Sequence, residues 1–239
     1  DETEMLVTWV VKSGSVHDTP TVEYGPSEGS LHLKATAEAT HFKEDKTEFR
    51  TFRALMTGLT AGGSTVYYRV GSSGTAWSKT FHFRTLSRSS SSSSWLPRLA
   101  IYGDLGYTNA QSTPYLVKEV AAGHLDALFH IGDFAYDLHS KDGERGHDFM
   151  EMIEPIAAQV PYMTIPGNHE EHANFSHYDA RFSMLGDRHQ PAQHKEGKPP
   201  LNHRLNNHYH SMTVGPVKVI MINTEYYYYT GYGWGQISR

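Results

Sequence analysis

Three segments of this 239-residue chain end in side chains that could hold metal ions. Each segment is apolar, and each leads into a glycine followed directly by carboxylate, phenol or amide groups. The three clusters are Gly103-Asp104-Leu105-Gly106, Gly132-Asp133-Phe134-Ala135-Tyr136 and Gly167-Asn168-His169-Glu170. The chain contains no cysteine. Oxygen donors without thiolates form a hard donor set, which suits iron, manganese or zinc.

The elements that position these clusters read as a βαβαβ unit. We expect strands at residues 99–102, 126–131 and 161–165, each just before one cluster. A first helix is predicted to begin near Ser112 and Pro114 and to end before Gly123. A second helix is indicated by apolar residues at helical spacing, namely Phe149, Met152, Ile153 and Ile156. Strands joined in this way are parallel and adjacent.

This arrangement brings the three clusters to one place, because ligands of an open α/β sheet bind beyond the carboxyl ends of its strands. A shared carboxylate lets two cations lie roughly 3.5–4 Å apart, as in two-metal hydrolases. We therefore predict that Asp133 bridges two metals and that Tyr136 reaches one of them. A single Gly-Asp or Asn-His step would indicate only a turn or a cap. Three such clusters at successive strand ends favour a functional site.

The N-terminal part of the chain has a different pattern. Short strands with alternating apolar residues are predicted at residues 6–11, 21–24, 31–34, 49–56, 66–70 and 81–84. Such a series indicates a β-sandwich over residues 1–86, and residues 58–71 resemble part of a fibronectin type III domain. A run of six serines at residues 89–94 indicates a flexible linker over residues 87–97. Residues 98–239 then form the α/β domain, in which a further strand pair is expected at 208–214 and 217–222.

Composition excludes several classes of protein. A net charge of −5 with a pI near 6.3 argues against a nucleic-acid binder, which usually carries a basic patch. No window approaches the ~18 consecutive apolar residues of a membrane-spanning helix. The absence of cysteine excludes disulfides and thiolate metal sites. The remaining picture is a globular protein with room for two domains.

The three clusters, in this order, resemble the first three metal-binding motifs of the purple acid phosphatases, which belong to the calcineurin-like metallophosphoesterases. The predicted sandwich is similar to the N-terminal domain of that family. Residues 150–170, 174–176 and 181–184 most resemble the long animal members. The resemblance implies a fibronectin type III-like β-sandwich followed by an α/β metallophosphoesterase domain that is incomplete at its C-terminus.

The resemblance also implies roles for individual residues. Asp104 and Tyr136 would bind a ferric ion, and Asp133 would bridge this ion to a second, divalent metal (iron, zinc or manganese). Asn168 would bind the second metal, and His169 would face the phosphate as a catalytic residue. The implied reaction is hydrolysis of phosphate monoesters at acid pH.

The chain departs from the family pattern in its histidines. The family completes its site with one histidine from a Val-x-x-His motif and two from a Gly-His-x-His motif, and neither motif occurs in these 239 residues. His208-Tyr209-His210 resembles the Gly-His-x-His motif, but Asn207 stands in place of the glycine and the segment comes before the strand at 217–222. An ordinary strand is the favoured interpretation of this segment.

Other motifs carry weaker signals. His169-Glu170-Glu171-His172 is one residue short of the zinc-protease His-Glu-x-x-His motif. His139 and His147 are expected on the loop after Tyr136, either bordering the substrate or simply solvated. The tyrosines at 226–229 could form a binding surface, but the favoured interpretation is that they lie half in the core, with partners outside these 239 residues. Asn174-Phe175-Ser176 is a glycosylation sequon, which matters only in a secreted protein.

Two functions of different classes remain open at this stage. The first is an acid phosphatase with a two-metal site, secreted or lysosomal, whose partner is a phosphate monoester rather than nucleic acid. The second is a shortened form that has lost catalysis and acts as an interaction module. A phosphodiesterase of the same superfamily is a nearer alternative, although the tyrosine of the second cluster favours the phosphatases.

Overall fold

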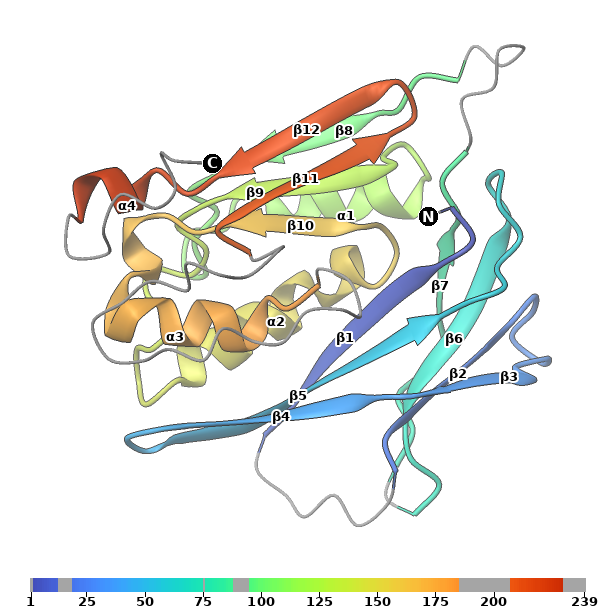
Figure 1. Ribbon diagram of the computed structural model, residues 1–239, viewed down its shortest axis with the longest axis horizontal. Coiled ribbons are helices and arrows are strands. Elements are labelled where there is room, and N and C mark those ends of the chain that lie inside the picture. Colours follow the sequence, from blue (N-terminus) through green and yellow to red (C-terminus); the bar gives the residue numbers. More distant parts are fainter. Residues whose placement is uncertain (1, 13–18, 75, 88–94, 185–206, 230–239) are drawn as a thin grey trace.

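The computed structural model describes residues 2–12, 19–74, 76–87, 95–184 and 207–229 of the chain. It contains an all-β part followed by an α/β part (Figure 1). The serine-rich linker predicted at 87–97 falls largely outside the described residues, so the proposed domain boundaries at 86 and 98 stay a prediction.

The N-terminal part is a two-sheet β-sandwich, as predicted. One sheet has the order β1-β5-β4 and the other β3-β2-β6-β7, and all pairings are antiparallel. Alternate residues of β6 are buried, which is the period expected for a strand with one face in the core. The strands are β1 (Met5–Lys12), β2 (Thr21–Gly25), β3 (Leu33–Thr36), β4 (Glu38–Glu44), β5 (Thr47–Met56), β6 (Thr65–Gly71) and β7 (Phe81–Arg84).

Two details of the sandwich differ from expectation. The strand predicted at 31–34 begins two residues later, at Leu33. Strand β4 was not predicted, because it is an edge strand whose sequence, EATHFKE, is mostly polar and exposed. Strand β5 is buried on both faces over much of its length, since Phe49 and Thr51 contact the α/β part.

The α/β part confirms the predicted βαβαβ unit. Strands β8 (Leu99–Tyr102), β9 (Ala127–Ile131) and β10 (Tyr162–Ile165) are parallel, in the order β10-β9-β8. Helix α1 (Thr113–Ala121) begins at the expected serine and proline, and α2 (Glu144–Ala157) has Phe149, Ile153 and Ile156 in the core. Gly123 has a φ of +68°, which lets the chain leave α1 in a conformation that residues with a Cβ rarely adopt.

The two faces of the parallel sheet are covered by different elements. Leu128 and Tyr162 pack with residues of α1 and α2 on one face. Phe129 and Met163 pack on the other face with the hairpin of β11 (Tyr209–Val214) and β12 (Val217–Ile222). Helix α3 (His172–Arg181), the 3₁₀ turn η1 (Asn168–Glu170) and α4 (Glu225–Tyr228) were not predicted. Figure 1 shows α4 near the carboxyl ends of the parallel strands.

Candidate metal centre

The carboxyl ends of the three parallel strands carry the three predicted clusters. Asp104 follows β8, Asp133 and Tyr136 follow β9, and Asn168 follows β10. Because the strands are parallel and adjacent, the loops that follow them leave the same edge of the sheet. The backbone joins two of these loops, since the N–H of Asp104 donates to the carbonyl of Gly132 at 3.1 Å.

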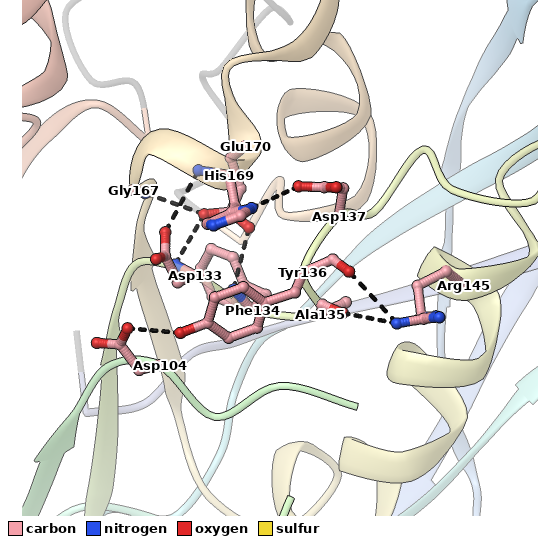
Figure 2. A network of polar contacts seen from close by, with 10 residues as sticks. All are labelled: Asp104, Asp133, Phe134, Ala135, Tyr136, Asp137, Arg145, Gly167, His169 and Glu170. Atoms are coloured by element: carbon pink, nitrogen blue, oxygen red, sulfur yellow. Dashed lines mark hydrogen bonds and ion pairs between the residues drawn. The ribbon is translucent and has the colours of Figure 1, made fainter. Parts of the chain in front are cut away.

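Tyr136 and Asp104 are in direct contact. The Tyr136 hydroxyl donates to Asp104 Oδ1 at 2.6 Å (Figure 2). This hydrogen bond, together with partial burial and the charges of Asp104 and Asp133, raises the pKa of Tyr136 to about 12. The phenol proton lies between the Tyr136 hydroxyl oxygen and Asp104 Oδ1. A cation that replaced this proton could bind both oxygens.

Asp133 lies against the loop that carries Asn168. The backbone N–H of His169 donates to Asp133 Oδ1 at 3.3 Å. A Cβ added to Gly167 would lie only 2.4 Å from the same oxygen, so this position requires glycine. Asn168 lies between Gly167 and His169 in the sequence, and it is exposed. The structure thus brings Asp133 and the Asn168 loop together, as the bridging role predicted for Asp133 requires.

The backbone is strained where these side chains leave it. Asp104, Asp133 and Tyr136 have φ values of +55°, +54° and +44°. Residues with a Cβ rarely adopt this left-handed conformation, at a cost of about 1–3 kcal/mol each. Strain of this kind persists at sites where function fixes the direction of a side chain. Its occurrence at three of the four predicted metal ligands supports a functional site.

Glu170 is a site residue that the sequence analysis missed. Glu170 is 2% exposed, and its carboxylate accepts hydrogen bonds from the backbone N–H groups of Asp133, Phe134 and Gly167 at 2.9, 3.0 and 3.0 Å. Burial raises its pKa to about 7, although the three backbone hydrogen bonds act in the opposite direction. Glu170 therefore ties the loop after β9 to the loop after β10 (Figure 2).

Asp137 is a second missed residue, and it holds His169. The ring Nδ1 of His169 lies 2.6 Å from Asp137 Oδ1, and the ring packs edge-on against Tyr136 with 4.5 Å between centroids. Burial lowers the pKa of His169, but the hydrogen bond to Asp137 and the charges of Asp133, Asp137 and Glu170 outweigh it, so the pKa is raised. Arg145 supports the same loop by donating to the carbonyls of Ala135 and Tyr136, at 3.3 Å each.

The donor set fits the hard cations predicted from the sequence. Asp104, Asp133 and Tyr136 offer carboxylate and phenol oxygens, and Asn168 offers an amide oxygen nearby. Within the described residues no group of three or more His, Cys, Asp or Glu side chains could hold a metal. The candidate centre consists instead of two carboxylates with a phenol and an amide, so Asp104, Asp133 and Tyr136 would hold one cation and Asp133 and Asn168 a second.

Two histidines of the His208-Tyr209-His210 segment have their own surroundings in the core. His208 and His210 are buried on and beside β11, and His208 pairs with Asp179 and Asn223 at 2.8 Å each. Strand β11 begins at Tyr209, so the strand interpretation is confirmed for Tyr209 and His210, whereas His208 lies in the turn just before the strand. The loop placement of His147 was wrong: it lies in α2, buried by the packing of Phe49 edge-on against its ring.

Helix α4 adds an acidic side chain near the centre. Its start is fixed by Asn223, whose Oδ1 accepts the backbone N–H of Glu225 at 2.8 Å. Burial and the charge of Asp133 raise the pKa of Glu225. Of the tyrosines at 226–229, Tyr226 is buried against His208 and Phe175, whereas Tyr228 is 79% exposed. The prediction that this run lies half in the core is confirmed, but the expected position of its partners was wrong, because Tyr226 packs on residues of this chain.

The sequon at Asn174 lies in an unusual backbone segment. Ala173, Asn174 and Phe175 all have positive φ, from +48° to +63°, within α3. Phe175 is buried and the hydroxyl of Ser176 donates to Glu44 of the sandwich. Glycosylation of Asn174 stays a prediction.

Comparison with known proteins identifies the family. The model for the N-terminal domain of purple acid phosphatases matches residues 1–85, and that for calcineurin-like phosphoesterases matches residues 97–234. The chain belongs to the purple acid phosphatases, a branch of the calcineurin-like phosphoesterases. Membership of this family implies a dinuclear metal centre, which agrees with the donor set described above.

Individual relatives show how much of the family architecture this chain spans. It is 42% identical to acid phosphatase type 7 of Danio rerio and 38% identical to that of Homo sapiens, covering 100% and 98% of this chain and 49% of each relative. The fold is similar to that of a purple acid phosphatase from yellow lupin seeds, with a TM-score of 0.70 and 22% identity over 93% of this chain and 43% of the other. The chain thus spans about half the length of the curated relatives it matches.

No helix among the described residues is long and apolar enough to cross a membrane.

Proposed function

We propose that this protein is an acid phosphatase that hydrolyses phosphate monoesters with one ferric ion and one divalent ion of iron, zinc or manganese. The observation that carries the proposal is the convergence of Asp104, Asp133 and Tyr136 at one sheet edge, with Asn168 on the adjoining loop. The tyrosine favours the iron-containing phosphatases over the phosphodiesterases of the superfamily.

Each residue of the candidate centre would have its own role in this reaction. Bound cations would supply the Lewis acidity that attack of water on a phosphate ester requires. Asp133 would offset the charge of both cations, and Tyr136 and Asp104 would hold the first of them. His169 has its Nδ1 engaged by Asp137, so its Nε2 is the ring nitrogen that can contact the phosphate. Glu170 keeps the loops of Asp133 and Asn168 in register through its backbone hydrogen bonds.

Further properties follow from the family and are part of the same proposal. The protein would be secreted or lysosomal, with Asn174 as a glycosylation site and a fibronectin type III-like sandwich. The net charge of −5 supports a small phosphate ester rather than nucleic acid as partner.

The proposal is tested by metal analysis and kinetics on the full-length gene product. Asp133→Asn should lose both metals and at least about a hundredfold of the rate on an aryl phosphate at acid pH, because it removes the charge shared by two cations. Asp142→Asn is the matched control, since Asp142 is exposed and its ion pair within the described part of the chain is with the surface residue Lys46, at 3.6 Å. Retention of both metals and full activity by Asp133→Asn would refute the proposal. A wild-type protein that binds metals but hydrolyses no phosphate ester would favour the interaction-module alternative.

A further inference from the structure

The sandwich contacts the two segments that carry the metal centre. The turn between β4 and β5 lies against the loop after Tyr136: Lys46 pairs with Asp142 at 3.6 Å, and a Cβ on Gly143 would lie 2.4 Å from the Thr47 methyl group. Figure 1 shows the ends of β4 and β5 reaching the region of α3. The sandwich is therefore packed against elements of the candidate site rather than tethered at a distance.

Glu44 is the centre of this contact. One carboxylate oxygen accepts the hydroxyl of Ser176, and the other lies 3.4 Å from Nε2 of His172 and 3.2 Å from Nε2 of His177. All three partners belong to α3, whereas Glu44 is the last residue of β4. A single carboxylate of the sandwich thus contacts three side chains of the α/β part.

The protonation of this cluster is fixed by a buried arginine. Arg181 is 1% exposed, lies 4.2 Å above the ring of Phe49, and donates to Nδ1 of His177 at 2.9 Å. Because Nδ1 of His177 accepts this bond, its Nε2 carries the proton, and this nitrogen lies 3.2 Å from the Glu44 carboxylate. Burial lowers the pKa of Arg181 to about 9, and the charges of Glu44 and Glu144 oppose that effect. Glu44 therefore also contributes negative charge beside a buried cation.

The contacts of Glu44 continue towards the metal centre through a pair of stacked histidines. His172 stacks on His139, with centroids 3.8 Å apart and planes 15° from parallel. His139 lies two residues after Asp137, and His172 lies three residues after His169. Asp137 and His169 are themselves joined at 2.6 Å. The same two segments are thus held together twice, by the histidine stack next to Glu44 and by the Asp137–His169 pair at the centre.

We propose that Glu44 is a positioning residue of the active centre: by holding His172 against His139, it keeps Asp137 aligned with His169. The sandwich then contributes directly to the geometry of catalysis. The inference rests on the proposed function only in its kinetic part, since the alignment itself is a contact between side chains of this chain.

The experiment follows the imidazole nitrogens of His139, His169 and His172 by NMR in the metal-free chain, assigned with single histidine variants. Glu44→Ala should shift the signals of all three, and Glu44→Gln, which keeps an acceptor oxygen, should shift them less. The matched control is Thr51→Val, which removes another buried contact between the two parts, the bond from Thr51 Oγ1 to the carbonyl of Ala180 at 2.6 Å. This control should leave the His169 signals unchanged.

Kinetics of the full-length gene product give the second readout. Misplacement of a catalytic group lowers turnover rather than substrate affinity, so we expect kcat to fall about tenfold in Glu44→Ala, with partial recovery in Glu44→Gln and little change in KM. Unchanged His169 signals and unchanged kcat in Glu44→Ala would overturn the inference, as would equal effects of Thr51→Val. If Glu44→Ala does not fold, Glu44→Gln decides in the same way. If the wild type has no phosphatase activity, the proposed function fails and the NMR measurement still tests the alignment.

Discussion

Replacing Glu170 by alanine tests whether this carboxylate holds the two metal-binding loops together. The substitution leaves the N–H groups of Asp133, Phe134 and Gly167 without their acceptor. An unsatisfied buried N–H costs roughly 1–3 kcal/mol. Part of the total cost is offset, because the substitution also removes a buried carboxylate whose burial raises its pKa to about 7. We therefore expect Glu170→Ala to lower the free energy of unfolding of the metal-free chain by roughly 3–5 kcal/mol at neutral pH.

Glu170→Gln gives a graded comparison. Its single oxygen can accept the two bonds now made by Oε2, but its amide would face the N–H of Phe134, so we expect a loss of about 1–3 kcal/mol. The assay is urea denaturation followed by tryptophan fluorescence. Glu151→Ala, an exposed glutamate on α2, is the control and should change stability by less than about 0.5 kcal/mol. A Glu170→Ala protein within about 1 kcal/mol of the wild type would refute the argument that Glu170 joins the loops.

Three further predictions concern acid stability, α4 and the bridging carboxylate. Burial lowers the pKa of His147 to about 4 in the folded chain, below the ~6.5 of an unfolded histidine, so its contribution to stability is present above pH ~6.5 and is lost as the pH falls towards 4. Urea denaturation should show about 2 kcal/mol less loss between pH 7.5 and 5 in His147→Leu than in the wild type, and an equal loss would contradict the assignment. Tyr226→Ala should cost roughly 3 kcal/mol because Tyr226 packs on His208 and Phe175, whereas Tyr228→Ala, at an exposed position, should be nearly neutral in the same assay. Gly167→Ala should weaken zinc binding in a calorimetric titration at least about tenfold, since its Cβ would displace Asp133, while Gly29→Ala, with open space around it, should not; equal affinities would argue against a role for Asp133.

The parts of the fold that the sequence predicts are those with a strong local pattern. Strand β8 is found where an apolar run is followed by glycine and aspartate, and α1 lies between a serine-proline start and a glycine end. The strand ends could be located in the same way, and they carry the predicted ligands. Strand β4 lacks such a pattern, because an edge strand exposes most of its side chains to solvent.

The supporting residues of the site could not be predicted for a different reason. The motif contains Glu170, but nothing in its spacing shows that the side chain turns inward to bind the backbone of Asp133, 37 residues earlier. The contact of Glu44 with Ser176 spans 132 residues and joins two parts of the chain. Both depend on tertiary packing, which periodicity and turn chemistry do not encode.

The central claim is that Tyr136 and the two aspartates form a cation site, and a ferric titration tests it most directly. Ferric ion added to the chain should produce a visible absorption band from a tyrosine phenolate bound to iron. Tyr136→Phe should still take up iron through Asp104 and Asp133 but lack this band, whereas Tyr228→Phe, at an exposed position on α4, should keep it. A band of equal strength in Tyr136→Phe, or bound iron without any band in the wild type, would contradict the account.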